Sequence, residues 1–101
     1  MTYKFRILDA ADRDIREAIR HYEVVRKGLS MDFELCLDEG YADILNVPLG
    51  YQIRYRDVRI KFIRRFPYGI HYLVEPGHII IIAVFHTSKS PRKWFDRLKG
   101  N

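Results

Sequence analysis

The sequence predicts an α+β fold: a strand, an antiparallel helix hairpin, a three- to four-stranded antiparallel sheet and a short C-terminal helix. Apolar residues recur at helical spacing between residues 9 and 46 and alternate with polar ones in the strand-like segments that follow. A Pro76-Gly77 pair separates the last two of these segments and is typical of a type II turn, because proline presets one central angle and glycine accepts the positive one. With 101 residues, of which 48% are apolar, residues 1–101 are expected to form a single domain.

The first half of the chain contains one predicted strand and two predicted helices. Residues 3–8 alternate as a half-buried strand does. Asp9 is expected to cap the first helix, Gly28 to close it at the C′ position, and Ser30 to cap the second helix. Pro48 is expected to end the second helix, and the short link at Gly28 makes the helices antiparallel. The two apolar stripes are Ala11, Ile15, Ala18, Ile19 and Tyr22, and Phe33, Leu37, Tyr41 and Ile44.

The second half is predicted to form strands at residues 51–56, 58–63, 69–75 and 78–86, followed by helical residues near Pro91. The run at 79–85 is apolar on both faces, which predicts a strand in the middle of the sheet. The first strand is expected to join this sheet beside a later strand, with its partner left open.

The turn at residues 76–77 predicts the register of the hairpin around it, with the pairs Glu75–His78, Leu73–Ile80 and His71–Ile82. One face should then pack on the helices, and it consists of Ile70, Tyr72, Val74, Ile79, Ile81, Ala83 and Phe85. The opposite face should form the floor of a groove for an amphipathic partner segment, and it consists of His71, Leu73, Glu75, His78, Ile80, Ile82, Val84 and His86.

Charge is divided unevenly along the chain. Residues 1–49 contain seven Lys/Arg and ten Asp/Glu, a net charge of −3, whereas residues 50–101 contain eleven and three, a net charge of +8. This asymmetry favours an acidic partner, either a protein segment or nucleic acid, over a merely solvated basic surface. The single Cys36 can form no internal disulfide, and neither a signal peptide nor a membrane span is expected, so the protein is expected to be cytoplasmic.

Candidate chemical groups are sparse. His71 and His86 are predicted to share a sheet face, but no third ligand stands at metal-binding spacing, so neither a metal nor another cofactor is expected. If the protein were a nuclease, His86 would be the candidate general base. The competing interpretation is a histidine satisfied by hydrogen bonds at the edge of the sheet, and no motif supports nucleophilic catalysis.

Two stretches resemble the RelE/ParE toxin superfamily. Residues 66–94 follow its C-terminal pattern of Phe-Pro-Tyr, an alternating strand, a turn, an aliphatic strand ending in His, and a short basic link to Pro and Trp. Residues 11–33 resemble its first helices, with Ala-x-x-Asp-Ile and then Tyr before Gly-Leu. The matching positions of the C-terminal pattern are Phe66, Pro67, Tyr68, Tyr72, His86, Pro91 and Trp94.

The resemblance implies the toxin of a bacterial type II toxin–antitoxin pair, neutralised by a cognate antitoxin in a hetero-oligomer. The ParE-like branch, which poisons DNA gyrase by binding, is favoured over the RelE-like branch, which cuts mRNA on the ribosome. Gly69 stands where RelE-like nucleases carry a phosphate-binding arginine, and Trp94 and Phe95 stand near their C-terminal tyrosine. The resemblance still allows Lys61 and Lys89 as equivalents of the nuclease lysines, which with His86 would be the catalytic candidates of an mRNA endonuclease. The alternatives that stay open are a ribosome-dependent mRNA endonuclease and a non-toxic protein-interaction module.

Two surfaces are expected for these partners. An acidic, amphipathic antitoxin segment is predicted to bind Arg59, Lys61, Arg64, Leu73, Ile80 and Ile82. The surface that contacts gyrase or the ribosome is predicted to consist of His86, Lys89, Arg92, Lys93, Trp94 and Arg97. The alternative for Trp94 is that it plugs the end of the sheet.

Overall fold

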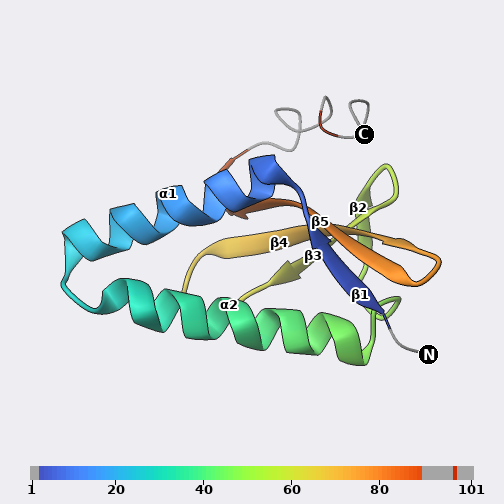
Figure 1. Ribbon diagram of the computed structural model, residues 1–101, viewed down its shortest axis with the longest axis horizontal. Helices are drawn as coiled ribbons and strands as arrows, with labels where there is room; N and C mark the ends of the chain where they lie inside the picture. Colours follow the sequence, from blue (N-terminus) through green and yellow to red (C-terminus); the bar gives the residue numbers. More distant parts are fainter. Residues whose placement is uncertain (1–2, 90–96, 98–101) are drawn as a thin grey trace.

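The computed structural model describes residues 3–89 and Arg97, and it places two antiparallel helices against one five-stranded sheet (Figure 1). The elements are β1 (Lys4–Ile7), α1 (Asp9–Val25), α2 (Leu29–Asn46), β2 (Ile53–Tyr55), β3 (Val58–Phe62), β4 (Tyr68–Glu75) and β5 (His78–His86). The predicted α+β class and element order are confirmed through β5. Apart from Arg97, the short helix expected near Pro91 lies outside the described residues.

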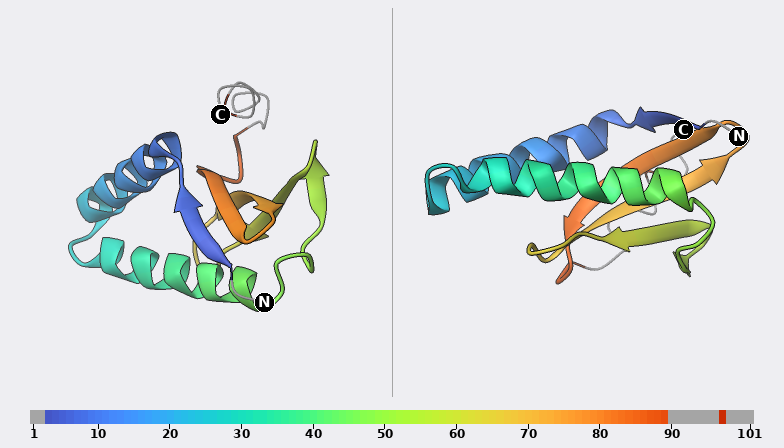
Figure 2. Two further views of the ribbon diagram at one scale, coloured as in Figure 1. Left: turned by 45° about the vertical axis from the view of Figure 1, so that its right-hand side comes forward. Right: turned by 90° about the horizontal axis from the view of Figure 1, so that it is seen from below.

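The strand order is β1-β5-β4-β3-β2. β1 runs parallel to β5, and the other neighbouring strands are antiparallel. β5 therefore lies between β1 and β4, which explains why its residues are apolar on both faces. The left view of Figure 2 shows the helix hairpin on one side of the twisted sheet.

The helix ends differ from the sequence prediction. Asp9 is the first residue of α1 and does not cap it, because the N-cap is Leu8. Gly28 adopts a left-handed φ of 87° but lies at the N-cap of α2, two residues beyond the C-cap of α1. Ser30 lies inside α2, where its hydroxyl donates a hydrogen bond of 2.7 Å to Glu23 Oε1. The same carboxylate oxygen accepts the Gly28 N–H at 3.2 Å, so a side chain from α1 supplies the acceptor expected from a local cap.

The β4–β5 hairpin contains a register shift that the sequence analysis did not anticipate. Glu75 pairs with His78 and Leu73 pairs with Ile80, as predicted. Tyr72 pairs with Ile81 but His71 pairs with Ala83, so the predicted His71–Ile82 pair is wrong and Ile82 is an extra residue in β5. Beyond this bulge the side chains of β5 point to the opposite faces from those predicted.

Burial follows the shifted register and produces two cores. Val84 joins the core between the helices and the sheet, whose other strand residues include Ile70, Tyr72, Ile79 and Ile81. Ala83 and Phe85 lie instead with Ile80 and Ile82 on the second face, where Val58, Tyr55, Leu73 and Leu8 pack against them. This face was expected to be an open groove floor, but Ile82 is 0% exposed and Ile80 is 8% exposed. The aliphatic middle of the second face is therefore a small core.

Gly40 lets α2 approach the sheet closely. A Cβ atom at this position would lie 2.8 Å from Cδ1 of Ile70 and 3.1 Å from Cγ2 of Ile63. We expect Gly40→Val to lower the free energy of unfolding by roughly 1–3 kcal/mol through overpacking, which exceeds the few tenths gained in helix propensity. Urea unfolding measures this change. Ala42→Val on the exposed face of α2 is the control and should cost less than about 1 kcal/mol; equal losses for the two variants would contradict the close approach.

Candidate interaction surface

The cations expected on the strands have partners within the chain. Arg64 forms a two-point contact with Glu39 of α2, at 2.7 and 3.0 Å. Lys61 lies 3.5 Å from the carboxylate of Asp43, also on α2. Arg59 donates hydrogen bonds to the carbonyl oxygens of Tyr51, at 2.6 Å, and Leu49, at 3.4 Å. Lys61 and Arg64 therefore help to hold β3 and the residue after Ile63 against α2, and Arg59 holds β3 against residues 49–51.

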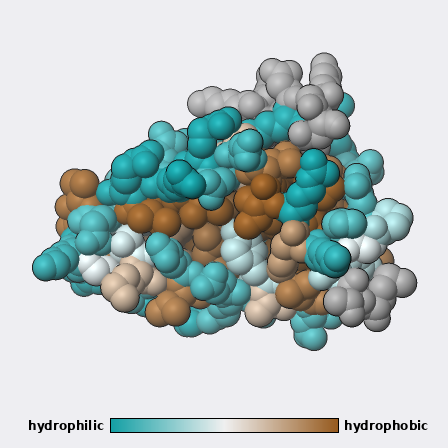
Figure 3. All heavy atoms as spheres, in the orientation of Figure 1, coloured by the Kyte–Doolittle hydropathy of each residue, from teal (hydrophilic) through white to brown (hydrophobic). Residues whose placement is uncertain are grey.

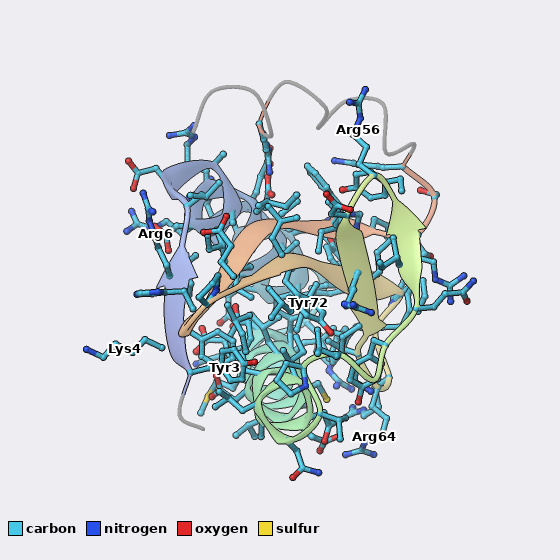
Figure 4. The ribbon with its side chains drawn as sticks, turned by 90° about the vertical axis from the view of Figure 1, so that its right-hand side faces the viewer. Tyr3, Lys4, Arg6, Arg56, Arg64 and Tyr72 are labelled. Carbon is cyan, nitrogen blue, oxygen red and sulfur yellow. The ribbon has the colours of Figure 1, made fainter. Side chains whose placement is uncertain are left out.

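The exposed basic side chains of the sheet are spread over its length. Figure 4 shows Arg56 at the tip of the β2–β3 turn and Arg64 at the opposite end, beside α2. Arg56 has a φ of 48°, and this left-handed conformation closes the tight turn. Arg54 on β2 lies 5.4 Å from the ring of Phe62, which is half-exposed on β3. The outer strands thus present cations beside an accessible aromatic ring.

His86 lies at the end of β5 and faces α1. Its ring packs edge-on against Tyr68, and its Nδ1 accepts the Ser88 N–H at 3.1 Å and lies 2.8 Å from the Ser88 hydroxyl oxygen. It lines a cleft of about 140 Å³ together with Asp14, Glu17, Ala18, His21, Tyr68, Val84, Phe85 and Lys89. Carboxylates and basic groups alternate around this cleft, so it is not a uniformly positive site.

His71 lies on the other face of the sheet, although it was predicted to share a face with His86. Its Nδ1 is 2.8 Å from the hydroxyl oxygen of Tyr55. Burial, with a smaller contribution from the Arg97 guanidinium, lowers the pKa of His71 to about 4. Burial also raises the pKa of Tyr55 to about 12. Both groups are therefore uncharged near neutral pH.

Arg97 was expected at an exposed target-binding surface, but its guanidinium forms an ion pair with a buried carboxylate. Its Nη1 and Nη2 donate to the two oxygens of Asp14, at 2.7 and 3.1 Å. Nη1 also donates to the carbonyl of Ile82 at 2.9 Å, and Asp14 accepts the Val84 N–H at 3.1 Å. β1 pairs with β5 only as far as Ile81. The ion pair therefore satisfies backbone groups of β5 where the neighbouring strand has ended.

The structure separates the catalytic candidates. Lys61 is on β3 and His86 on β5, with β4 between them, so two strand spacings, about 10 Å, separate their backbones. Lys61 points to Asp43, whereas His86 opens toward α1. Only Lys89 shares the cleft with His86, and its ammonium lies 5.3 Å from the Phe85 ring. Arg92, Lys93 and Trp94 lie outside the described residues.

A different cleft takes the place of the predicted groove. It has a volume of about 370 Å³ and is lined by Leu49, Ile53, Asp57, Arg59, Leu73, Val74 and Glu75. Of the six residues expected to bind the antitoxin, Arg59 and Leu73 line it, while Ile80 and Ile82 are buried. Leu49 and Ile53 are exposed, so the cleft offers apolar surface next to charged groups.

Among residues 3–89 and 97, no cluster of three or more His, Cys, Asp or Glu is placed to hold a metal ion. Within the same residues, no helix is both long enough and apolar enough to cross a membrane.

The sequence analysis did not identify two residues with contacts around β4 and β5, namely Asp14 and Tyr55. Asp14 occupies the buried side of α1 with Ala11 and Ala18, and a carboxylate at a core position of a helix was the available signal. Tyr55 was assigned only to a strand, and nothing local to its sequence indicates that it contacts His71.

We expect Arg97→Ala to lower the free energy of unfolding by on the order of 3 kcal/mol, because it leaves Asp14 buried without its cation. Thermal and urea unfolding measure the effect. Arg13→Ala is the matched control, because Arg13 is exposed on α1 and forms no ion pair with the described residues. Adding Asp14→Asn to Arg97→Ala should recover part of the loss. If Arg97→Ala were as stable as wild type, the ion pair would not stabilise the folded chain.

The depressed pKa of His71 predicts a pH dependence of stability. Its pKa rises from about 4 in the folded chain to about 6.5 in the unfolded chain, so the unfolded state binds more protons between these values. The contribution of neutral His71 to the free energy of unfolding is complete above about pH 6.5 and is lost as the pH falls toward 4. Urea unfolding between pH 4 and 7 should show a shallower decline for His71→Gln than for wild type. His78→Gln, at an exposed site, should keep the wild-type slope; if both variants keep it, the prediction is wrong.

A family model described as the ParE toxin of type II toxin–antitoxin system, parDE, matches residues 5–91. Comparison with curated protein sequences gives no match. Among solved structures the chain is similar to one described as the chromosomal ParDE TA system from P. aeruginosa, with a TM-score of 0.75 and 16% sequence identity. The superposition covers 84% of this chain and 96% of that chain, and at this identity it shows a shared fold. Because the family model spans most of the sequence, the chain belongs to the ParE toxin family of type II toxin–antitoxin systems.

Proposed function

We propose that this toxin acts in the cytoplasm by binding and poisoning DNA gyrase, and that a cognate antitoxin neutralises it in a hetero-oligomer. Membership of the ParE toxin family supports the toxin class. The gyrase target rests on that membership together with the chemistry of the sheet.

The observation that carries the proposal is the separation of the nuclease candidates: Lys61 on β3 contacts Asp43 of α2, whereas His86 and Lys89 line a cleft beside α1. RNA cleavage requires proton transfer at both the attacking and the leaving oxygen. His71 is buried and neutral beside Tyr55, and His86 lies on the other side of the sheet. A protein that acts by binding needs only a surface of suitable shape and charge, which favours a gyrase poison over a nuclease.

The surroundings of Gly69 support the same choice. A Cβ atom there would lie 2.7 Å from Cγ2 of Ile60 and 3.4 Å from the Phe62 ring. An arginine could enter this position only if Ile60 moved. The phosphate-binding arginine expected of a RelE-like nuclease therefore has no ready place in this sheet.

For the antitoxin, we propose an acidic amphipathic segment that binds the cleft containing Arg59 and Leu73. Leu49 and Ile53 supply exposed apolar contacts at this cleft. Arg54 and Arg56 lie between Ile53 and Asp57 in the sequence of the β2–β3 hairpin and add positive charge beside a cleft whose own charged residues are Arg59, Asp57 and Glu75. An acidic chain that orders on binding would be attracted by these charges and held by the apolar rim.

Inducing the toxin alone should distinguish the possible activities. A gyrase poison should produce DNA-damage signalling and filamentous cells while mRNA stays intact, and gyrase supercoiling should be inhibited in vitro. Cleavage of mRNA at codon boundaries on translating ribosomes would contradict the proposal and favour the endonuclease alternative. Normal growth with verified folded protein would favour a non-toxic interaction module.

The same strains test the antitoxin and the target-binding surface. We expect the gene of a small acidic antitoxin to adjoin the toxin gene, and co-expression of that protein should restore growth and yield a complex that stays together at low salt. Arg92→Ala/Lys93→Ala should fold but lose toxicity if these cations contact the target. Arg97 is left unchanged in this variant, because its ion pair with Asp14 would confound stability with activity.

A further inference from the structure

Helix α2 carries a second apolar stripe, on the side facing away from the sheet. Phe33, Leu37 and Ile44 form its buried face. On the opposite side Met31, Leu35 and Leu45 are 68%, 67% and 42% exposed, and Ala42 is also exposed. Figure 3, in the orientation of Figure 1, shows brown and tan spheres among teal ones along the lower edge, where α2 runs. An outward stripe of this size is unusual for a helix whose other face is already packed.

The spacing of the outward stripe is that of a helix–helix seam. Positions 31, 35, 38, 42 and 45 are separated by four, three, four and three residues, which is the a/d pattern of a heptad repeat. Over this range the helix rises about 21 Å, so one side of a partner helix could cover the whole stripe. Apolar residues occupy every position of this seam except the central one, Asp38.

The charged residues around the seam restrict the kind of partner that can bind it. On the flank toward β3, Asp32, Glu39 and Asp43 are paired with cations of the chain itself, namely Arg65, Arg64 and Lys61. Asp38 in the seam and Glu34 on the other flank are exposed, and no cation among residues 3–89 and 97 forms an ion pair with either. An occupant of the seam must therefore bring positive charge to its centre.

We propose that the seam formed by Met31, Leu35, Asp38, Ala42 and Leu45 is a docking surface for an amphipathic helix of another protein. That helix carries apolar residues at heptad spacing and a lysine or arginine opposite Asp38. Its charge is opposite to that of the acidic segment proposed for the sheet cleft, so it constitutes a separate contact.

A second copy of this chain is a poor occupant. In a two-fold pairing of fully overlapping seams, whether parallel or antiparallel, the central Asp38 would face the same residue of the other copy. Two carboxylates without a cation would then be brought together in an apolar contact, which is strongly unfavourable. Asp38 thus acts against self-association and selects a basic partner, as single polar seam residues do in coiled coils.

The test uses two labelled three-heptad helical peptides with leucine at the seam positions, identical except for lysine or glutamate at the centre. Fluorescence anisotropy with the full-length toxin should show the lysine peptide binding about tenfold more tightly than the glutamate peptide. Asp38→Lys should reverse this preference, and Leu35→Glu should abolish binding of both peptides. Val24→Glu is the control, because Val24 is 88% exposed but lies on α1, outside the seam.

Self-association gives an independent readout. Wild-type toxin should be monomeric in sedimentation, whereas Asp38→Leu should dimerise, because the substitution completes an apolar seam. Equal affinity for the two peptides, no binding of either, or a wild-type dimer that Leu35→Glu dissociates would each overturn the proposal. None of these measurements depends on toxicity, so their failure is distinguishable from failure of the gyrase proposal.

Discussion

The extra residue at Ile82 in β5 determines how the two faces of the sheet are used. Without it, Ala83 and Phe85 would face the helices and Val84 would face away. With it, Val84 completes the core under α1, and Phe85 forms the second core with Ile80 and Ile82. The bulge therefore decides which core each residue beyond Ile82 joins, because adding a residue inverts the alternation of every side chain beyond it.

The bulge lies next to the point where β5 loses one of its neighbours. β1 pairs with β5 only to Ile81, and the next backbone groups meet side chains instead of a strand. Asp14 from α1 accepts the Val84 N–H, and Arg97 donates to the Ile82 carbonyl. The same guanidinium lies 4.9 Å from the Phe85 ring, and it adds to the larger effect of burial in lowering the pKa of His71. One ion pair between residues far apart in sequence thus connects α1, the end of β5 and the buried histidine.

The two proposed contacts use opposite charges on different parts of the molecule. On the sheet side the cations Arg54 and Arg56 suit an acidic segment, and they belong to the hairpin beside the cleft with Leu73, whose own charged residues are Arg59, Asp57 and Glu75. The outer side of α2 presents Asp38 and Glu34 in and beside an apolar seam, which suits a basic helix. The chain neutralises the α2 carboxylates that face β3 with its own cations and leaves these two without such partners among the described residues. This distribution separates the two kinds of partner by electrostatics as well as by position.

Sequence patterns correctly predicted the order and type of the elements through β5 and the pairing next to the Pro76-Gly77 turn. Those features depend on periodicity and turn chemistry within a few residues, which a single sequence displays directly. The resemblance carried by residues 66–94 and 11–33 agreed with the family model. The bulge at Ile82, the partner of β1 and the Asp14–Arg97 ion pair became visible only in the folded chain. Residues 79–85 of β5 are apolar on both faces, so no polar residue next to Ile82 marks the shift in register. The ion pair joins groups that only the folded chain brings together.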